Sequence, residues 1–479
     1  MSKTYRPYNP DQQFLLAPSL RDWLPEGHLV YFVSDTIDEM DLSSIEGVYE
    51  KSRVGYPPYH PRMMVKLLFY AYCTGTFSSR KIASKLEDDV AFRILAAGNK
   101  PDFRTISDFR KLHLDALKTL FVEVLMLCSR AGMVRLGHVS LDGTKQKANA
   151  SKHKAMSYVR MKEESARLSE EISQLLSRAG KVDETEDGEL GLNVRGDELP
   201  KELAFRQGRL GRIRQAMAEL EAEAKQACEN EQVGNAGCGD EAKADGDGAK
   251  PAGVGRAKKK PADVPADKAQ KNFTDGESKI MLSGNKSFIQ GYNAQAAVDS
   301  DYQVVVASAL TNQAADSVHV ELMVEEIEQI NGQVPDEMSL DAGYYSDANV
   351  KYLEAKNIDV YMPPMRLKHR EYRQAKPDPI DENTPTRERM KSKVLTDVGR
   401  EKYGLRKQTV EPVFGQIKRC LGFRQFSMRG IKACEAEWNL VCAAHNLLKL
   451  FRYGAVAMAA MAQESMKAAQ SANALAFAA

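Results

Sequence analysis

Two short apolar runs that end in the same three residues, Ser-Leu-Asp, constrain the fold of this chain more than any other feature. The first is His138-Val-Ser-Leu-Asp-Gly-Thr144, and the second is Met338-Ser-Leu-Asp-Ala-Gly-Tyr344. Each is typical of a short buried strand, so we expect Asp142 and Asp341 at the ends of neighbouring strands. Gly143, after the first aspartate, would leave room for a phosphate backbone to approach. Because 199 residues separate the two aspartates, the fold must bring them together across a long insertion.

A third acidic residue, Glu411, lies in Arg406-Lys-Gln-Thr-Val-Glu-Pro-Val-Phe-Gly-Gln-Ile-Lys418, which has helical spacing. Lys418 comes seven residues later and Lys407 four residues earlier, so both share the helix face of Glu411. Arg406 is offset by about 140°, and we expect it to contact another part of a substrate. Residues 401–432 hold eight Lys or Arg against two acids, which suits phosphate contacts. The alternative is a solvated basic helix with its apolar side in the core.

Two carboxylates at strand ends and a third on a late helix suit a site that holds two divalent metal ions. Burying like-charged carboxylates side by side is costly unless cations neutralise them. Mg²⁺, or Mn²⁺, suits such an all-oxygen site, and a pair of these ions can drive in-line displacement at a phosphodiester. Four other aspartates are weaker candidates: Asp275, Asp299, Asp301 and Asp347. Of these, we expect Asp299, at a predicted strand end, to flank the site.

Several other classes of protein are disfavoured. The eight histidines do not cluster with cysteines, which argues against a zinc site, and we expect His445 to have a core or capping role. The motifs GxSxG, GxxxxGK[ST] and GxGxxG are absent. The seven cysteines form no CxxC pair, which predicts reduced thiols in a cytoplasmic protein. No uninterrupted apolar run reaches about 18 residues, so we expect no membrane span.

Residues 1–132 are predicted to form a helical N-terminal domain that binds DNA. One helix begins at a proline, Gly75-Thr-Phe-Ser78 interrupts the pattern, and a short basic helix with Arg80 and Lys81 follows. A third helix is expected from about residue 105 towards 130. Helix, turn and short basic helix resemble a helix-turn-helix arrangement. The alternative is that the basic side chains only solvate a helix face.

The catalytic domain is expected to combine residues 133–150 with residues 272–452. Its fold class is α+β or α/β, with a mixed sheet flanked by helices. Beyond the strands that lead to the two aspartates, we expect a hairpin of 292–299 and 303–309, a strand at 358–362, and helices at 316–330 and 349–356. The sheet should therefore place the two aspartates side by side.

A long insertion follows the first predicted strand. Residues 151–228 carry apolar side chains at three- and four-residue steps, which predicts an antiparallel pair of helices joined by a loop at 181–200. Residues 229–271 have almost no large apolar side chain and are predicted to be a disordered low-complexity linker. The Ala-rich tail, 453–479, is expected to be a frayed helix.

Taken together, these residues resemble the DDE transposases of bacterial insertion sequences, and more narrowly the branch with a Tyr-Arg-Glu-Lys pattern around the last acid. The matching segments are Leu141-Asp-Gly-Thr144, Gly291-Tyr-Asn-Ala-Gln295, Leu340-Asp-Ala-Gly-Tyr344, Tyr403, Arg406, Glu411 and Lys418, with Tyr59-His-Pro-Arg-Met63 and Phe103-Arg-Thr-Ile-Ser-Asp-Phe-Arg110 in the N-terminal part. The resemblance covers roughly residues 10–150 and 272–450. One departure is that four residues, not the usual three, separate Arg406 from Glu411.

The resemblance implies a ribonuclease-H-like fold in which Asp142, Asp341 and Glu411 are catalytic and hold two Mg²⁺ or Mn²⁺ ions. DNA would be bound by seven residues: Tyr403, Arg406, Lys407, Lys418, Arg419, Arg80 and Lys81. Because of the altered spacing, either Lys407 takes the place of the arginine on the Glu411 face or the spacing varies within the branch. Tyr403 as a covalent nucleophile is disfavoured, because it lacks Arg-His partners.

The leading hypothesis is therefore a transposase that binds the ends of an insertion sequence, cleaves them by metal-dependent hydrolysis and joins the 3′-OH ends to target DNA. The alternatives are a ribonuclease-H-like nuclease without strand transfer and a non-catalytic DNA-binding derivative. The expected partner is double-stranded DNA, with no membrane, and the protein should be a homodimer or larger oligomer on DNA. We expect a cytoplasmic, nucleoid-associated location in a bacterium.

Overall fold

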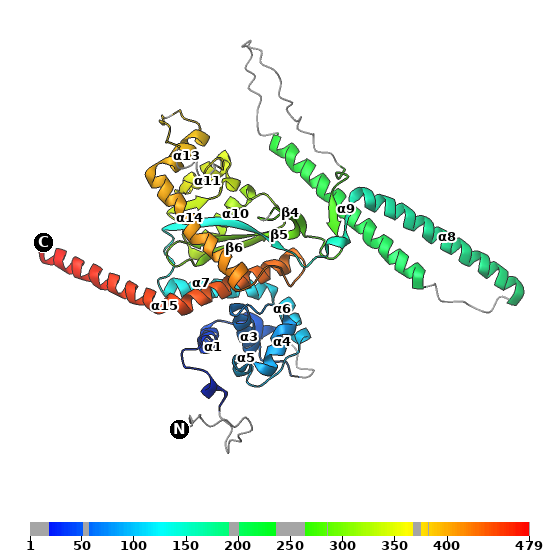
Figure 1. Ribbon diagram of the computed structural model, residues 1–479, viewed down its shortest axis with the longest axis horizontal. Coiled ribbons are helices and arrows are strands. Elements are labelled where there is room, and N and C mark those ends of the chain that lie inside the picture. Colours follow the sequence, from blue (N-terminus) through cyan, green and yellow to red (C-terminus); the bar gives the residue numbers. More distant parts are fainter. Residues whose placement is uncertain are drawn as a thin grey trace, which may run out of the picture. The chain divides into compact units, whose positions relative to one another are not determined.

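The computed structural model describes residues 19–50, 57–190, 201–235, 264–284, 286–366, 375–381 and 383–478. The chain forms two compact units (Figure 1). The first combines residues 1–148, 282–287 and 292–479, and the second combines residues 149–281 and 288–291. The helices of residues 1–132 thus belong to the same compact unit as most of the sheet, rather than to a unit of their own.

The N-terminal part of the first unit is helical. Its elements are a 3-10 helix at Leu20–Trp23, α1 Leu29–Glu39, α2 Ser43–Glu50, α3 Pro61–Cys73, α4 Ser79–Asp88, α5 Val90–Leu95, α6 Phe103–Leu112 and α7 Leu114–Arg130. Pro61 stands in the first turn of α3, where its missing N–H costs nothing. The turn between α3 and α4 contains Gly75 with φ of 73°, a conformation that favours glycine.

The prediction of one helix from residue 105 to 130 is wrong. Two helices occupy this segment, and His113 between them has φ of −113° and ψ of 35°, outside the helical region. Asp102 starts α6 two residues earlier than expected, because its carboxylate accepts hydrogen bonds from the backbone N–H groups of Arg104 and Thr105.

A mixed sheet lies mostly in the first unit, while residues 279–281 and 288–291 of its strands belong to the second. Its strands are β1 His138–Lys147, β4 Lys279–Leu282, β5 Phe288–Asp299, β6 Val305–Thr311, β7 Glu337–Leu340 and β8 Asp359–Tyr361. The order is β4-β5-β1-β7-β8, and β6 pairs with β5. The predicted hairpin is confirmed, since β5 and β6 are antiparallel. Strands β1, β7 and β8 are parallel, and Leu141 pairs with Leu340, so the two Ser-Leu-Asp runs lie in register.

Strand β1 is longer than the sequence indicates. We expected Asp142 at its end, but the strand continues to Lys147. The extension is held by the segment after residue 420: the Gln146 side-chain amide donates to the Phe423 carbonyl over 2.9 Å, and Lys147 forms a bridge with Gln425. Asp142 therefore lies within β1, directly after its last residue paired with β7.

Helices pack on the sheet. They are α10 Val320–Asn331, α11 Asp347–Ala355, α13 Thr386–Leu395, α14 Asp397–Gly415, a π-helical continuation at Gln416–Cys420, and α15 Ile431–Ala478, with short 3-10 helices at Ser317–His319 and Ala342–Tyr344. Helices α10 and α15 contact β6, α14 contacts β1 and β7, and α7 packs against α15. The tail, 453–479, was expected to be a separate, frayed helix. Residues 453–478 instead continue α15 without a break.

The second unit contains the helical insertion. Its elements are a 3-10 helix at Lys152–Lys154, β2 Ala155–Ser157, α8 Tyr158–Leu190, α9 Lys201–Asn235 and β3 Gln270–Asn272, with β2 and β3 antiparallel. Leu168 of α8 packs with Leu210, Ile213 and Leu220 of α9, as the apolar steps predict. The same apolar cluster also contains Tyr158, Met161 and Ala216.

Two boundaries in the insertion differ from expectation. Residues 181–190 continue α8 where a loop was predicted, and residues 229–235 continue α9 where disorder was predicted. Residues 270–272 form β3. Residues 264–269 are described but form no helix or strand, and 191–200 and 236–263 lie outside the described residues. In the portions of the chain that are described, no helix combines the length and the apolar character needed to cross a bilayer.

Candidate active site

The three predicted acids converge on one guanidinium group. Nη1 of Arg406 lies 2.7 Å from Oδ2 of Asp142. Its Nη2 lies 3.6 Å from Oδ2 of Asp341 and 3.7 Å from Oε1 of Glu411. Because all three carboxylates touch the same planar group, they must lie close to one another, although Asp142 belongs to β1, Asp341 follows β7 and Glu411 belongs to α14. The three acids are therefore neighbours in the structure, although they lie far apart in the sequence.

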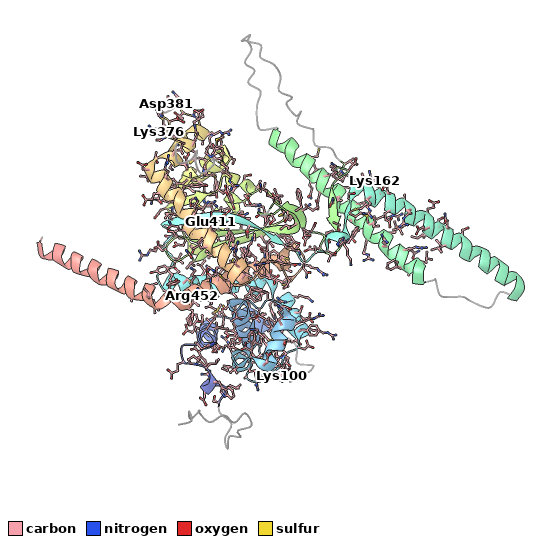
Figure 2. The ribbon with its side chains drawn as sticks, viewed as in Figure 1. Lys100, Lys162, Lys376, Asp381, Glu411 and Arg452 are labelled. Carbon is pink, nitrogen blue, oxygen red and sulfur yellow. The ribbon has the colours of Figure 1, made fainter. Side chains whose placement is uncertain are left out.

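Each acid is placed by a different local device. The parallel pairing of Leu141 with Leu340 brings Asp142 and Asp341 to the same level of the sheet. Asp341 follows β7 and begins a 3-10 turn, where its side chain accepts a hydrogen bond from the Gly343 N–H. Glu411 projects from α14, the helix that packs over β1 and β7 (Figure 2).

The electrostatics of the site favour a bound cation. Burial raises the pKa of Asp142 to about 6, Arg406 opposes this rise, and Asp341 and Asp316 add to it. The Asp142 side chain is 20 % exposed, whereas those of Asp341 and Glu411 are 44 % and 51 % exposed. Asp142 is therefore the least exposed of the three acids, and Asp341 and Glu411 are accessible to solvent.

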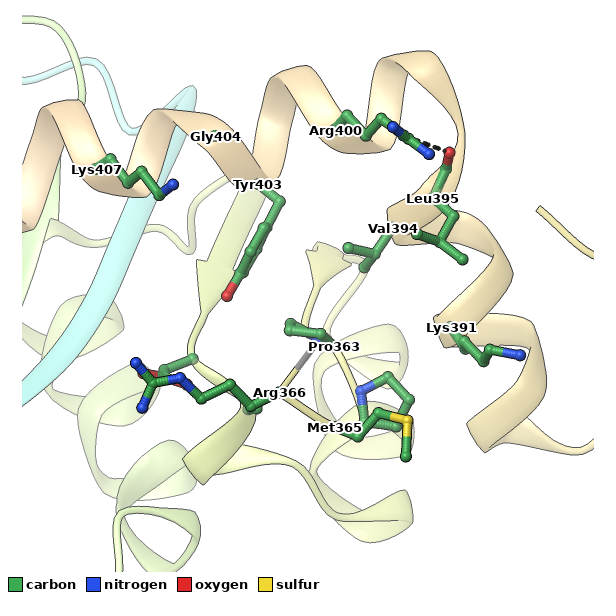
Figure 3. Close-up of a pocket in the computed structure, with 13 residues that line it drawn as sticks. Pro363, Met365, Arg366, Lys391, Val394, Leu395, Arg400, Tyr403, Gly404 and Lys407 are labelled. Atoms are coloured by element: carbon green, nitrogen blue, oxygen red, sulfur yellow. Dashed lines mark hydrogen bonds between the residues drawn. The ribbon is translucent and has the colours of Figure 1, made fainter. Parts of the chain in front are cut away.

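The expectation that Arg406 points elsewhere is wrong. A helical wheel places its Cα about 140° from that of Glu411, but the long side chain curls back to the acids and is only 12 % exposed. Lys407, the alternative basic partner, does not take this place. It lines a cavity with Asp341, Tyr403, Arg366 and Arg400, and Figure 3 shows the Tyr403 ring projecting into this space.

The other predicted DNA-binding residues occupy two regions. Nζ of Lys418 donates a hydrogen bond to Oγ1 of Thr144, two residues after Asp142 on β1, and burial lowers the pKa of Lys418. Arg419 is exposed beside it. Arg80 and Lys81 are exposed on α4, which Figure 1 shows well apart from α14, and the Arg80 guanidinium lies 5.0 Å from the centre of the Phe103 ring.

A polar cluster beside Asp142 was not predicted. Oδ1 of Asp316 accepts hydrogen bonds from Lys145, Asn293 and Gln295. The OH of Tyr344 donates to Oε1 of Gln295. Asn293 and Gln295 belong to the motif Gly291-Tyr-Asn-Ala-Gln295 noted in the sequence. Asp316 has no such motif around it, because it lies in the connection between β6 and α10.

This cluster also changes the role expected of Gly143. A Cβ there would lie 2.4 Å from Nε2 of Gln295 and 2.8 Å from Oδ1 of Asp316. The space next to Gly143 is therefore filled by protein side chains rather than left for a phosphate backbone.

Replacing Gly143 by Ala should lower the free energy of unfolding by about 1–3 kcal/mol, because the buried cluster has no room for a methyl group. Urea unfolding followed by circular dichroism measures this. Gly137→Ala is the matched control, since a Cβ at Gly137 meets nothing within 4 Å. Equal stability of the two variants would contradict the packing argument.

Asp299 and His445 have structural roles. Asp299 does not flank the site: its Oδ2 accepts the backbone N–H groups of Arg135 and Leu136, over 3.2 and 2.8 Å, and holds the turn before β1. His445 is buried, and its Nε2 lies 2.9 Å from the Gln303 carbonyl oxygen, which agrees with the expected core role.

Two family models match the chain. One, described as Transposase domain (DUF772), matches residues 18–112, and the other, described as Transposase DDE domain, matches residues 262–447. Comparison with curated proteins and with solved structures found no match. The matches define a DNA transposase. More narrowly, the chain belongs to the DDE transposases of insertion sequences.

The family match bears on the fold and on the acids. DDE transposase domains imply a ribonuclease-H-like fold, and the sheet here is mixed and flanked by helices. The matched range contains Asp341 and Glu411 but begins after Asp142. Asp142 is therefore a candidate because of its geometry and its repeated Ser-Leu-Asp setting.

Proposed function

We propose that this transposase binds the ends of an insertion sequence, cleaves them by metal-dependent phosphodiester hydrolysis and joins the 3′-OH ends to target DNA. The observation that carries the proposal is the convergence of Asp142, Asp341 and Glu411 on Arg406. Three carboxylates around a single positive group leave an excess of negative charge, which divalent cations offset.

The donor set fits divalent ions that prefer oxygen. Within the described ranges, no three metal-ligating side chains already stand in a binding arrangement, and the Arg406 guanidinium lies among the acids. The carboxylates of Asp142, Asp341 and Glu411 would hold two Mg²⁺ or Mn²⁺ ions. When bound, such ions activate a water nucleophile and stabilise the departing oxygen at a phosphodiester. Asp142, being the most buried, would fix the position of the site, and the exposed Asp341 and Glu411 would admit the DNA.

Basic and aromatic groups next to the acids supply the proposed DNA contacts. Lys407 and Tyr403 line the cavity that Asp341 borders. Lys418 and Arg419 lie on the π-helical end of α14. Arg406 would contact a phosphate once metal ions take over the acids, and Arg80 and Lys81 would bind DNA farther from the cleavage site. Because joining needs two element ends, we expect a homodimer or a larger oligomer on DNA, in the cytoplasm near the nucleoid.

An assay with a labelled insertion-sequence end, Mg²⁺ and a target plasmid tests the proposal. Cleavage with a joined product supports it. Cleavage without joining would indicate a nuclease, and metal-independent DNA binding without cleavage would indicate a non-catalytic derivative.

Arg406→Met should make Mg²⁺ binding tighter, by about tenfold, or about 1.4 kcal/mol, because it removes a cation that competes for the same carboxylates. Without metal, the melting temperature should fall, since three acids lose their common partner. Thermal unfolding with increasing Mg²⁺ measures both effects. Lys407→Met is the control, because Lys407 lies on the same helix one residue along. Weaker or unchanged Mg²⁺ binding in Arg406→Met would contradict the competition.

A further inference from the structure

Asp316 presents a fourth carboxylate next to the three acids. It directly precedes the 3-10 helix Ser317–His319, in the connection between β6 and α10. Its Oδ1 accepts three hydrogen bonds: from Nζ of Lys145 over 2.8 Å, from Nδ2 of Asn293 over 2.7 Å and from Nε2 of Gln295 over 3.0 Å. One oxygen of this carboxylate is therefore fixed by donors from two neighbouring strands, β1 and β5.

The other oxygen faces the turn that follows Asp341. A Cβ on Gly343 would lie 3.5 Å from Oδ2 of Asp316, and Gly343 is the residue whose N–H donates to Asp341. The two segments are tied together by Asn349, whose Nδ2 donates to the carbonyls of Ser317 and Tyr344, each over 2.7 Å. Asp316 is thus held against the Asp341 turn and is not a loosely placed surface acid.

Asn293 gives an independent sign that the same spot is built for a ligand. Its side chain is fully buried, and within the described residues its Oδ1 has no hydrogen-bond partner. Buried oxygen atoms of this kind are normally satisfied, so an exception calls for an explanation. This oxygen lies 3.0 Å from the position of a Cβ on Gly143, and Oδ1 of Asp316 lies 2.8 Å from it. Both groups therefore border Asp142 at its following residue.

The charges around this spot are unbalanced. Asp142, Asp341, Glu411 and Asp316 carry four negative charges. Among the described residues, Arg406 and Lys145 form ion pairs with them, and Lys418 lies near Asp142. The side chains of Asp316 and Lys145 are 25 % and 16 % exposed, so solvent screens them only partly. Partly buried carboxylates left in excess favour a divalent cation.

We infer that Asp316 is a fourth acidic residue of the proposed metal centre, and that its Oδ2 would add a carboxylate oxygen to the ligands supplied by Asp142 and Asp341. The side-chain amides of Asn293 and Gln295 hold the carboxylate in place and orient this oxygen, whereas Lys145 places a competing positive charge beside it. This inference rests on the proposed function, because it adds one ligand group to the proposed site.

Titration of the full-length protein with Mn²⁺ in the absence of DNA, followed by electron paramagnetic resonance of the free ion, tests the inference. Asp316→Asn keeps the size of the side chain and should weaken Mn²⁺ binding by about tenfold. Lys145→Met removes a competing cation but leaves the carboxylate, and should bind Mn²⁺ more tightly than the wild type. Asp301→Asn, which alters an acid paired with Arg135, should bind like the wild type.

The outcomes separate the inference from the proposed function. Normal Mn²⁺ binding by Asp316→Asn, together with loss of binding by Asp142→Asn, would overturn the role of Asp316 and leave the three-acid site intact. Normal binding by both variants would remove the proposed metal site itself. If Asp316→Asn fails to fold, Lys145→Met decides: tighter binding supports the inference, and equal or weaker binding overturns it.

Discussion

Asp142→Asn is expected to lower cleavage of a labelled insertion-sequence end by at least about 10³-fold, the loss that corresponds to about 4 kcal/mol of transition-state stabilisation. The substitution keeps the shape of the side chain but removes the charge of the most buried acid. It also removes the closest partner of the Arg406 guanidinium, 2.7 Å away. Rates of 3′-end formation in Mg²⁺, measured under single-turnover conditions, give the effect directly.

A DNA-binding measurement distinguishes the loss of cleavage from a loss of the folded protein. In the absence of metal, Asp142→Asn should bind the insertion-sequence end at least as tightly as the wild type, because a negative charge near the phosphates has been removed. Asp341→Asn and Glu411→Gln should show the same pattern, and Asp301→Asn should cleave normally. Cleavage retained by any of the three variants would exclude that residue from the catalytic set.

The two aspartates were predictable because their signal is local. Val139, Leu141, Met338 and Leu340 form short apolar runs that become buried, neighbouring strands. Their parallel register is given by the structure alone. The hairpin of β5 and β6 was predictable for the same reason, since the three polar residues at 300–302 separate two apolar segments.

The positions of the Arg406 and Asp316 side chains could not be predicted from local sequence patterns. A helical wheel gives the direction of each Cα, but an arginine side chain is long enough to return to a face from which its Cα points away. Asp316 lies outside any regular pattern, and the residues that fix it come from β1 and β5. The continuation of β1 beyond Asp142 likewise depends on contacts with Phe423 and Gln425, almost 300 residues later. Such features depend on tertiary contacts that no local pattern contains.

Glu437→Ala is expected to lower the free energy of unfolding by about 3–5 kcal/mol, because it leaves the Arg110 guanidinium buried without its countercharge. The two side chains are 0 % and 6 % exposed, and Nη1 of Arg110 lies 3.8 Å from Oε1 of Glu437. Oε2 of Glu437 also accepts the backbone N–H groups of Ser427 and Met428, over 2.8 and 3.2 Å. Tyr72 bonds to both members of the pair.

This buried pair joins the N-terminal helices to the part of the chain that follows α14. Arg110, the last residue of a motif that the sequence singles out, also donates to Ser79 at the start of α4 and to Ser427. Gly75 packs so closely on the carbonyl of Leu421 that a Cβ there would lie 2.5 Å from it. Loss of Glu437 should therefore loosen the contact between the proposed DNA-binding helices and residues 421–437.

Urea unfolding of a double-mutant cycle measures the effect. Glu437→Gln keeps one of the two acceptor oxygens and the size of the side chain, and should cost less than Glu437→Ala. Arg110→Met combined with Glu437→Met should cost less than the sum of the single changes, because neither charge is then left alone. Additive single effects would show that the two charges do not stabilise each other. The contact between the N-terminal helices and residues 421–437 would then depend on apolar packing, such as that of Phe77 against Phe423, whose ring centres lie 5.0 Å apart.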